Sequence, residues 1–259
     1  MMRQMHWMSV GFHMMHIENR VIKKGSDMLK NIFFIVFAWF TIINSYGQQA
    51  DVMCRETTND LIIYYPQYSD IDLACGQMPE KADTNVIFCC EAAFTGQLLT
   101  VFQHSNIAGH HVSGGKFYRG YKCKPNTGCF VFYKNQWKFL LHNYADELKV
   151  AADNGGMGFG QNMIIYDGET QPSFKKLQSK FEYRALCEYH GKLCVIDSKG
   201  VVSYASFIES LEKIGVTHAL YLDMGRGWNH SWYRNNDGNV VEIHPKTHSY
   251  TTNWLVFKK

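Results

Sequence analysis

Short apolar runs separated by polar turn residues dominate the chain from residue 48 onward. Each run is a few residues long, is rich in β-branched or aromatic side chains, and is bounded by Gly, Asn or Asp, which is typical of β-strands. The predicted strands are Leu61–Tyr65, Val86–Cys90, Leu98–Phe102, Cys129–Tyr133, Met163–Tyr166, Arg184–Tyr189, Lys192–Asp197, His218–Leu222 and Trp254–Phe257.

One segment has the apolar spacing of a helix. In Tyr204–Ile214 the apolar residues recur every three or four positions. Gly215 is placed to end this helix, and either Ser203 or Ser206 can cap its start. A second helix is predicted near Asp146–Ala152.

The segment 192–223 has the order strand, helix, strand. Such a crossover usually makes its two strands parallel, so we expect Asp197 and Asp223 to end their strands at the same edge of the sheet. Two carboxylates there can serve acid–base chemistry or hold a cation. The alternative is that each Asp only begins a turn. We predict an α+β fold, a mixed β-sheet with few helices, in one domain over residues 48–259.

The N-terminal part has the features of an export signal. Ile32–Ile43 is an apolar run of twelve residues, whereas a bilayer span needs roughly 20. Lys30 precedes the run and small residues follow it, so we expect a signal peptide cleaved near Gly47, and a secreted or periplasmic protein that meets the membrane only during export. The alternative is an uncleaved anchor. Met28 would begin a signal of ordinary length, so the chain start can lie there rather than at residue 1.

Composition and charge exclude two classes of protein. With 46% hydrophobic and 15% aromatic residues the chain is not disordered. Residues 1–47 hold five basic and two acidic side chains, which account for the net charge of +3, and the remainder balances 21 basic against 21 acidic residues. The chain after residue 47 thus has no net charge and lacks the basic surface that nucleic acids require, so no nucleic-acid partner is expected.

All eight cysteines follow residue 47, and an even number in an exported protein favours disulfides. Cys187 and Cys194 flank a two-residue turn that would place them opposite each other, and Cys123 and Cys129 bracket a turn-rich loop, so we predict these two pairs. The pairing of the remaining four is left open: Cys54, Cys75, Cys89 and Cys90.

Two further patterns suggest ligands only weakly. His104, His110 and His111 lie within eight residues, but their spacing matches no zinc pattern, so a polar loop is favoured over a metal site. The glycine-rich segment 154–160 neither follows a predicted strand nor opens a predicted helix, which disfavours a dinucleotide site. We therefore expect no metal and no cofactor.

A more specific pattern begins at Arg184-Ala185 and continues through the strand end at Asp197, the helix, the run Ala219–Asp223 and a glycine turn at 225–227. This order resembles the phosphodiester glycosidase family, which includes the lysosomal uncovering enzyme and many exported bacterial proteins. In that family an Arg-Thr-Ala strand, a Val-Asp strand end and a helix precede an Ala-Leu-x-Leu-Asp-Gly-Gly turn. Phe88–Phe94 stands where the family has an Asn-Gly-Gly-Phe-Phe motif. The resemblance covers most of the chain after residue 47.

The chain departs from the family at two motifs. Glu91 stands in place of the family Asn, and Ala92 and Ala93 replace the glycines that follow it. In the later turn, Met224 separates Asp223 from the first glycine. The resemblance therefore implies a divergent member of the family, whose fold carries over better than its activity.

The resemblance implies hydrolysis of the bond between a sugar's anomeric carbon and a phosphate. Arg184 would bind the phosphate with its planar guanidinium, and Asp223 and Glu91 would act as acid, base or nucleophile. The other residues expected to bind substrate are Asp197, Gly225, Arg226, Gly227, Trp228 and His230.

Two functions remain open. The first is an exported hydrolase that cleaves a sugar-1-phosphate diester or a related glycosidic bond. The alternative is a non-catalytic glycan-binding domain on the same fold, in which aromatic residues of the segment 228–233 stack on sugar rings. The altered motifs favour the binding domain, whereas Arg184, Asp197 and Asp223 favour the enzyme. In both cases the expected partner is a carbohydrate or a sugar phosphate.

Overall fold

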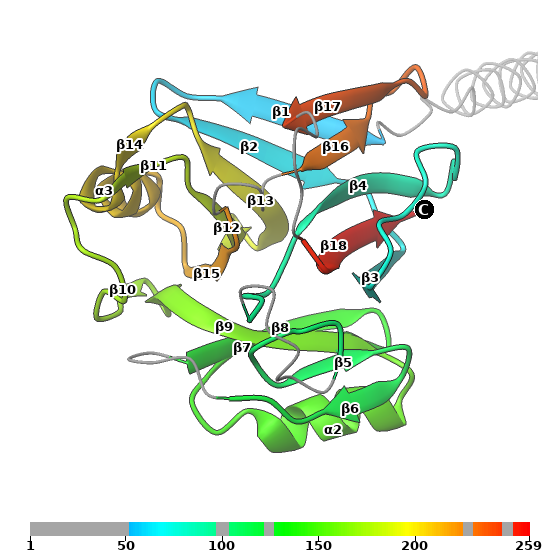
Figure 1. The fold of residues 1–259 in the computed structure, drawn as a ribbon. Coiled ribbons are helices and arrows are strands. Elements are labelled where there is room, and N and C mark those ends of the chain that lie inside the picture. Colours follow the sequence, from blue (N-terminus) through cyan, green and yellow to red (C-terminus); the bar gives the residue numbers. More distant parts are fainter. Residues whose placement is uncertain (1–51, 97–103, 122–126, 225–229, 245–250) are drawn as a thin grey trace, which may run out of the picture. The chain divides into compact units, whose positions relative to one another are not determined.

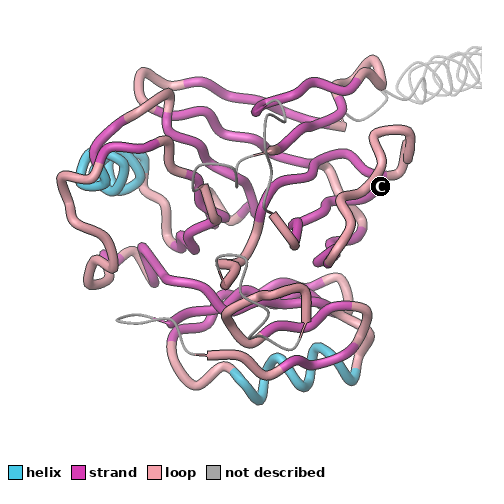
Figure 2. The backbone as a smooth tube through the Cα atoms, viewed as in Figure 1, coloured by secondary structure: helices cyan, strands magenta, loops and turns pink. Residues whose placement is uncertain are grey.

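Two antiparallel β-sheets carry the described part of the fold, and the two helices found there are short (Figures 1 and 2). The computed structural model describes residues 52–96, 104–121, 127–224, 230–244 and 251–259. The predicted signal region 1–47 and the predicted strand Leu98–Phe102 lie outside these residues. Neither described helix is long and apolar enough to span a bilayer.

Among the described residues one sheet has eleven strands, the other has five, and two further strands pair only with each other. The eleven-stranded sheet holds β1 (Met53–Thr57), β2 (Leu61–Pro66), β5 (His111–Ser113), β6 (Lys116–Tyr118), β7 (Thr127–Tyr133), β8 (Gln136–Leu141), β9 (Met157–Tyr166), β10 (Glu169–Thr170), β12 (Arg184–Tyr189), β13 (Lys192–Ser198) and β15 (His218–Leu222). The five-stranded sheet holds β3 (Asp70–Cys75), β4 (Val86–Glu91), β16 (Ser231–Arg234), β17 (Val240–His244) and β18 (Asn253–Lys258), and the two further strands are β11 (Lys180–Phe181) and β14 (Val202–Ser203).

The strands that were predicted and fall within the described residues are all found. Those that were not predicted include β1, β8 and β17, whose side chains are largely exposed or half-buried. A strand of this kind has no continuous apolar run, because few of its side chains enter the core. These three strands therefore gave no apolar run from which they could be recognised.

The helix α3 (Tyr204–Ile214) forms as predicted. The backbone N–H of Ser206 donates to the Oγ of Ser203 at 3.0 Å, which identifies Ser203 as the N-cap. Gly215 ends the helix in the left-handed region at φ = +84°, where glycine is favoured. The second helix, α2 (Ala145–Asp153), packs against β5, β6, β7 and β9 at the bottom of Figure 1.

The strand–helix–strand segment 192–223 contains β13, α3 and β15, but its two strands do not pair with each other. Instead β12 lies between them and pairs antiparallel with both. Every strand pair in the described residues is antiparallel, so the predicted mixed sheet is an antiparallel one. The hairpin after Tyr189 produces this order, because it inserts β12 between the two strands that the helix connects.

The main hydrophobic core lies where the two sheets face each other. Phe88 and Phe257 of the five-stranded sheet are fully buried, with their ring centroids 5.8 Å apart. Tyr64 on β2 reaches across from the other sheet, and its ring lies 5.5 Å from that of Phe88. Burying one such ring contributes about 1.5–3 kcal/mol. This core fixes the strand ends that carry the candidate site.

The predicted disulfide between Cys187 and Cys194 is not formed. Cys187 and Cys194 face each other across the β12–β13 hairpin, as the turn predicted, but both are free thiols. The Sγ of Cys194 points to the carbonyl oxygen of Cys187 at 3.7 Å, and both side chains are buried among apolar neighbours as small hydrophobic residues. Cys129 is also free, and Cys123 lies outside the described residues. The cysteines left unassigned are free as well: Cys54, Cys75, Cys89 and Cys90.

Candidate functional site

Charged residues from four strand ends meet between the two sheets. Glu91 ends β4, Arg184 begins β12, Asp197 lies near the end of β13, and Asp223 follows β15. Arg184 stands opposite Asp197 in one strand pair and opposite the last residue of β15 in the other. The backbone N–H of Asp223 donates to the carbonyl oxygen of Ala92 at 3.1 Å, which joins the end of β15 to the end of β4.

Arg184 is completely buried and is held by two carboxylates. Its Nε and Nη2 donate to the two oxygens of Asp197 at 2.6 and 2.7 Å, a bidentate pair. Its Nη1 lies 3.5 Å from the Oε2 of Glu91. Burial lowers the pKa of Arg184, but the charge and hydrogen bonds of Asp197 outweigh this effect and raise it above its ordinary value. The guanidinium is therefore charged and anchored.

Glu91 is fully buried, and neither of its carboxylate oxygens has a hydrogen-bond partner within the described residues. Burial raises the pKa of Glu91 well above its ordinary value; Arg184 offsets part of this rise, while Asp223 and Asp197 add to it. A carboxyl group with a raised pKa keeps its proton longer, which suits a general acid.

The position of Glu91 depends on a side chain that the sequence did not single out. Asn253 begins β18 and is fully buried. Its Oδ1 accepts from the backbone N–H of Ala93 at 2.7 Å, and its Nδ2 donates to the carbonyl oxygen of Ala93 at 3.1 Å. These two bonds fix the chain just after Glu91, so Asn253 is a positioning residue for the candidate acid.

Lys175 was also missed and supplies a cation beside Asp223. Its Nζ lies 4.9 Å from the ring centroid of Tyr221 and 5.5 Å from that of Phe174, within cation–π range. Burial lowers the pKa of Lys175, and the charge of Asp223 opposes this shift. Lys175 lies between β10 and β11 in a stretch without periodic apolar residues, so no local sequence signal marked it.

A titratable histidine, His244, lies near the ion pair of Arg184 and Asp197. His244 ends β17, and its Nδ1 lies 3.8 Å from a carboxylate oxygen of Glu182. Burial and the charge of Arg184 lower the pKa of His244, and Asp197 and Glu182 oppose the shift. The ring therefore favours its neutral form more than an ordinary histidine does.

Only part of the predicted substrate-binding set can be placed. Gly225, Arg226, Gly227 and Trp228 lie outside the described residues. His230 is buried just before β16. Trp232 is fully buried and packs with Val86, Cys89 and Trp254, so this residue of the aromatic segment belongs to the core and is not available to stack on a sugar.

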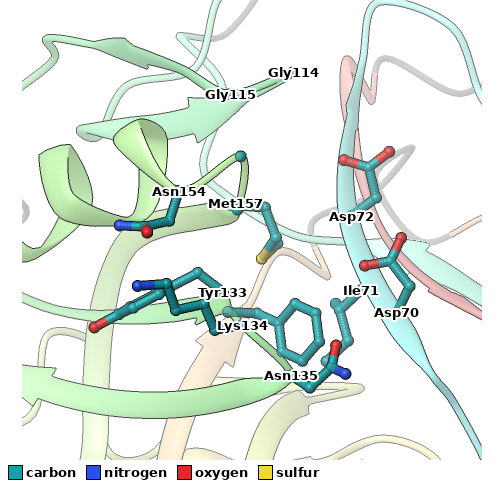
Figure 3. Close-up of a pocket in the computed structure, with 13 residues that line it drawn as sticks. Asp70, Ile71, Asp72, Gly114, Gly115, Tyr133, Lys134, Asn135, Asn154 and Met157 are labelled. Atoms are coloured by element: carbon teal, nitrogen blue, oxygen red, sulfur yellow. The ribbon is translucent and has the colours of Figure 1, made fainter.

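A pocket of about 450 Å³ lies away from the charged cluster, between β3 and the turns that follow β7 and α2 (Figure 3). None of the predicted site residues lines it. Asp72, one of its acidic residues, is paired with the Nζ of Lys258 at 2.9 Å. The pocket therefore adds no support to the site predicted from the sequence. Its lining residues are Asp70, Ile71, Asp72, Gly114, Gly115, Phe132, Tyr133, Lys134, Asn135, Asn154, Gly155, Gly156 and Met157.

Among the solved structures of similar fold is the catalytic domain of zebrafish N-acetylglucosamine-1-phosphodiester alpha-N-acetylglucosaminidase, auto-inhibited by its pro-peptide. The similarity covers 83% of this chain and 86% of that one, with a TM-score of 0.55 and 12% sequence identity. No protein-family profile and no curated protein matches the sequence. At this identity the comparison shows a distant similarity of fold.

Proposed function

We propose that this protein is an exported hydrolase of the phosphodiester glycosidase type, which cleaves a sugar-1-phosphate diester or a related glycosidic bond. The observation that carries the proposal is the convergence of Glu91 and Asp197 on the guanidinium of Arg184, with Asp223 close enough for its charge to raise the pKa of Glu91. Enzymes that cleave glycosidic bonds usually use two carboxyl groups in different environments. The similarity of fold to the zebrafish catalytic domain supports the same class of reaction.

The environments of the carboxyl groups suggest separate roles. Glu91, with its raised pKa, would donate a proton to the leaving oxygen. Asp223 is 8% exposed, so it is the more accessible carboxylate and would act as nucleophile or base. Lys175, which interacts with Asp223, would contribute positive charge near a phosphate.

Arg184 would contact the substrate through one nitrogen only. Asp197 occupies Nε and Nη2, whereas Nη1 has no hydrogen-bond partner in the described part of the chain. In this proposal Asp197 orients the guanidinium and Nη1 donates to a phosphate oxygen.

The alternative is a non-catalytic glycan-binding domain on the same fold. It is favoured by the complete burial of Arg184, whose guanidinium Asp197 already holds in two bonds. If the cluster serves only to stabilise the fold, glycan binding would persist without turnover and without any contribution from Nη1.

Turnover of a chromogenic sugar-1-phosphodiester tests the proposal. We expect hydrolysis by the protein, its loss in Asp223→Asn, and its retention in Asp237→Asn, an exposed aspartate in the turn before β17. Circular dichroism would show that both variants fold. Binding of the glycan without hydrolysis would instead establish the alternative. The export part of the proposal is tested by N-terminal sequencing of the protein recovered outside the cytoplasm, which should begin near Gln48.

A further inference from the structure

A thiol and two imidazoles from three separate segments meet outside the charged cluster. Cys75 ends β3, His104 lies in the segment that leads to β5, and His111 begins β5. The Sγ of Cys75 and one ring nitrogen of each histidine lie within 4.8 Å of one another. We propose that Cys75, His104 and His111 form a zinc site.

The hydrogen bonds of His111 fix the ring atom that would bind the ion. Its Nδ1 lies 3.0 Å from the carbonyl oxygen of Gly109, and because a carbonyl only accepts, Nδ1 carries the proton. The Nε2 then carries no proton, and its lone pair faces the Nδ1 of His104 at 3.2 Å, from which it accepts a hydrogen bond when no ion is bound. Histidines that bind metals usually donate their other ring N–H to a carbonyl or carboxylate in this way.

The surroundings hold both rings in place. Tyr118 stacks on His104 and on His111, with ring centroids 4.0 and 5.0 Å apart and planes 10° from parallel in each case. Gly109, whose carbonyl oxygen orients His111, is packed so closely against β9 that a Cβ there would lie 2.6 Å from the carbonyl oxygen of Gly160. The supporting shell is therefore rigid, as a metal site requires.

The donor atoms suit zinc. One sulfur and two imidazole nitrogens are ligands that Zn²⁺ prefers, and three protein ligands leave a fourth position for water or another group. Burial lowers the pKa of His111 to about 4, so its ring is neutral. Burial raises the pKa of Cys75 to about 11, so the thiol is protonated without an ion. Binding of Zn²⁺ replaces that proton, which passes to solvent, and forms a zinc–thiolate bond.

Two other interpretations account for less of this geometry. A hydrogen bond between the two rings alone does not explain why a thiol lies within 4.8 Å of both nitrogens. A catalytic Cys–His pair needs one thiol and one imidazole, so it does not explain why a second imidazole nitrogen lies within 4.8 Å of both. The third neighbouring histidine, His110, does not belong to the site, because its Nδ1 accepts from the backbone N–H of Gly120 at 2.8 Å.

Zinc titration of the full chain against a chromogenic chelator tests the site. We expect one high-affinity equivalent, with affinity reduced at least ~100-fold in Cys75→Ser and His104→Gln, because even the loss of a supporting contact costs about 10–100-fold. Matched controls are Cys54→Ser and His142→Asn, which replace an exposed cysteine and an exposed histidine and should leave the affinity unchanged.

Cobalt substitution gives a second measurement that needs no destabilised variant. Co²⁺ bound to the wild-type chain should show a thiolate-to-metal charge-transfer band, and residues 1–47, which contain no cysteine, cannot produce it. Protection of Cys75 from alkylation by Zn²⁺ should accompany the band. The proposal is overturned if no band forms, if the band survives in Cys75→Ser, or if the control variants lose zinc equally. None of these measurements depends on hydrolase activity.

Discussion

Asp197 accepts hydrogen bonds of 2.6 and 2.7 Å from the Nε and Nη2 of Arg184. The remaining nitrogen, Nη1, lies 3.5 Å from the Oε2 of Glu91. The three side chains come from three strands of two different sheets. All three are buried, and the charge of Arg184 is compensated mainly by Asp197. This relationship governs both the stability of the core around the site and the chemistry that the site can perform.

Removing one partner should therefore be costly. Asp197→Asn leaves the buried guanidinium without its main counter-ion, and we expect the free energy of unfolding to fall by about 3–5 kcal/mol. Urea denaturation measures the loss. The control is Asp72→Asn, which breaks the half-exposed pair with Lys258 and should cost no more than about 1 kcal/mol. Equal losses in the two variants would show that the Arg184–Asp197 pair contributes no more to the free energy of unfolding than the half-exposed pair does.

The raised pKa of Glu91 predicts a pH-dependent difference in stability. Because the folded-state pKa lies above the ordinary value of 4.5, the folded protein binds a proton more tightly than the unfolded chain. The stabilisation from this proton is complete below about pH 4.5 and is lost as the pH rises through the folded-state pKa. Glu91→Gln is permanently neutral, so its Tm should match the wild type near pH 4 and exceed it increasingly towards neutral pH. Parallel Tm curves would refute the raised pKa.

The same variant should separate stability from catalysis. Glu91→Gln keeps the shape of the protonated side chain but cannot donate its proton. If Glu91 is the general acid, turnover of a sugar phosphodiester should fall by about 10²–10⁴-fold. A stable variant with full activity would remove Glu91 from the mechanism while leaving the fold intact.

The sequence predicted the parts of the site that follow from local patterns. Arg184, Asp197 and Asp223 each mark a strand end, and apolar runs define those ends. No local sequence pattern predicts that Glu91 lies close to Arg184, because this contact depends on how one sheet packs against the other. The same reason explains why Cys75 was not linked to His111: Cys75 ends β3 of the five-stranded sheet, whereas His111 begins β5 of the eleven-stranded sheet.

We expect Asn253 to contribute strongly to the stability of the fold although it carries no charge. Its side chain satisfies both the N–H and the carbonyl oxygen of Ala93 in a fully buried position. Asn253→Ala leaves both groups unpaired, and we expect at least ~2 kcal/mol of stability to be lost. Asn154→Ala, in which an exposed side chain loses one bond to Val150, should cost less than about 0.5 kcal/mol. Chemical denaturation of both variants provides the comparison.

Lys175 offers the sharpest test of phosphate recognition at the site. Lys175→Met keeps much of the apolar stem that packs on Tyr221 but removes the cation beside Asp223. Because hydrogen bonds to charged groups contribute about 1.5–3 kcal/mol, the KM for a sugar phosphodiester should rise roughly 10-fold or more, with a smaller change in kcat. The neighbouring Lys176 is exposed, so Lys176→Met should leave both constants unchanged. An uncharged glycoside substrate should be insensitive to either substitution, and an equal effect on both substrates would exclude Lys175 as a phosphate ligand.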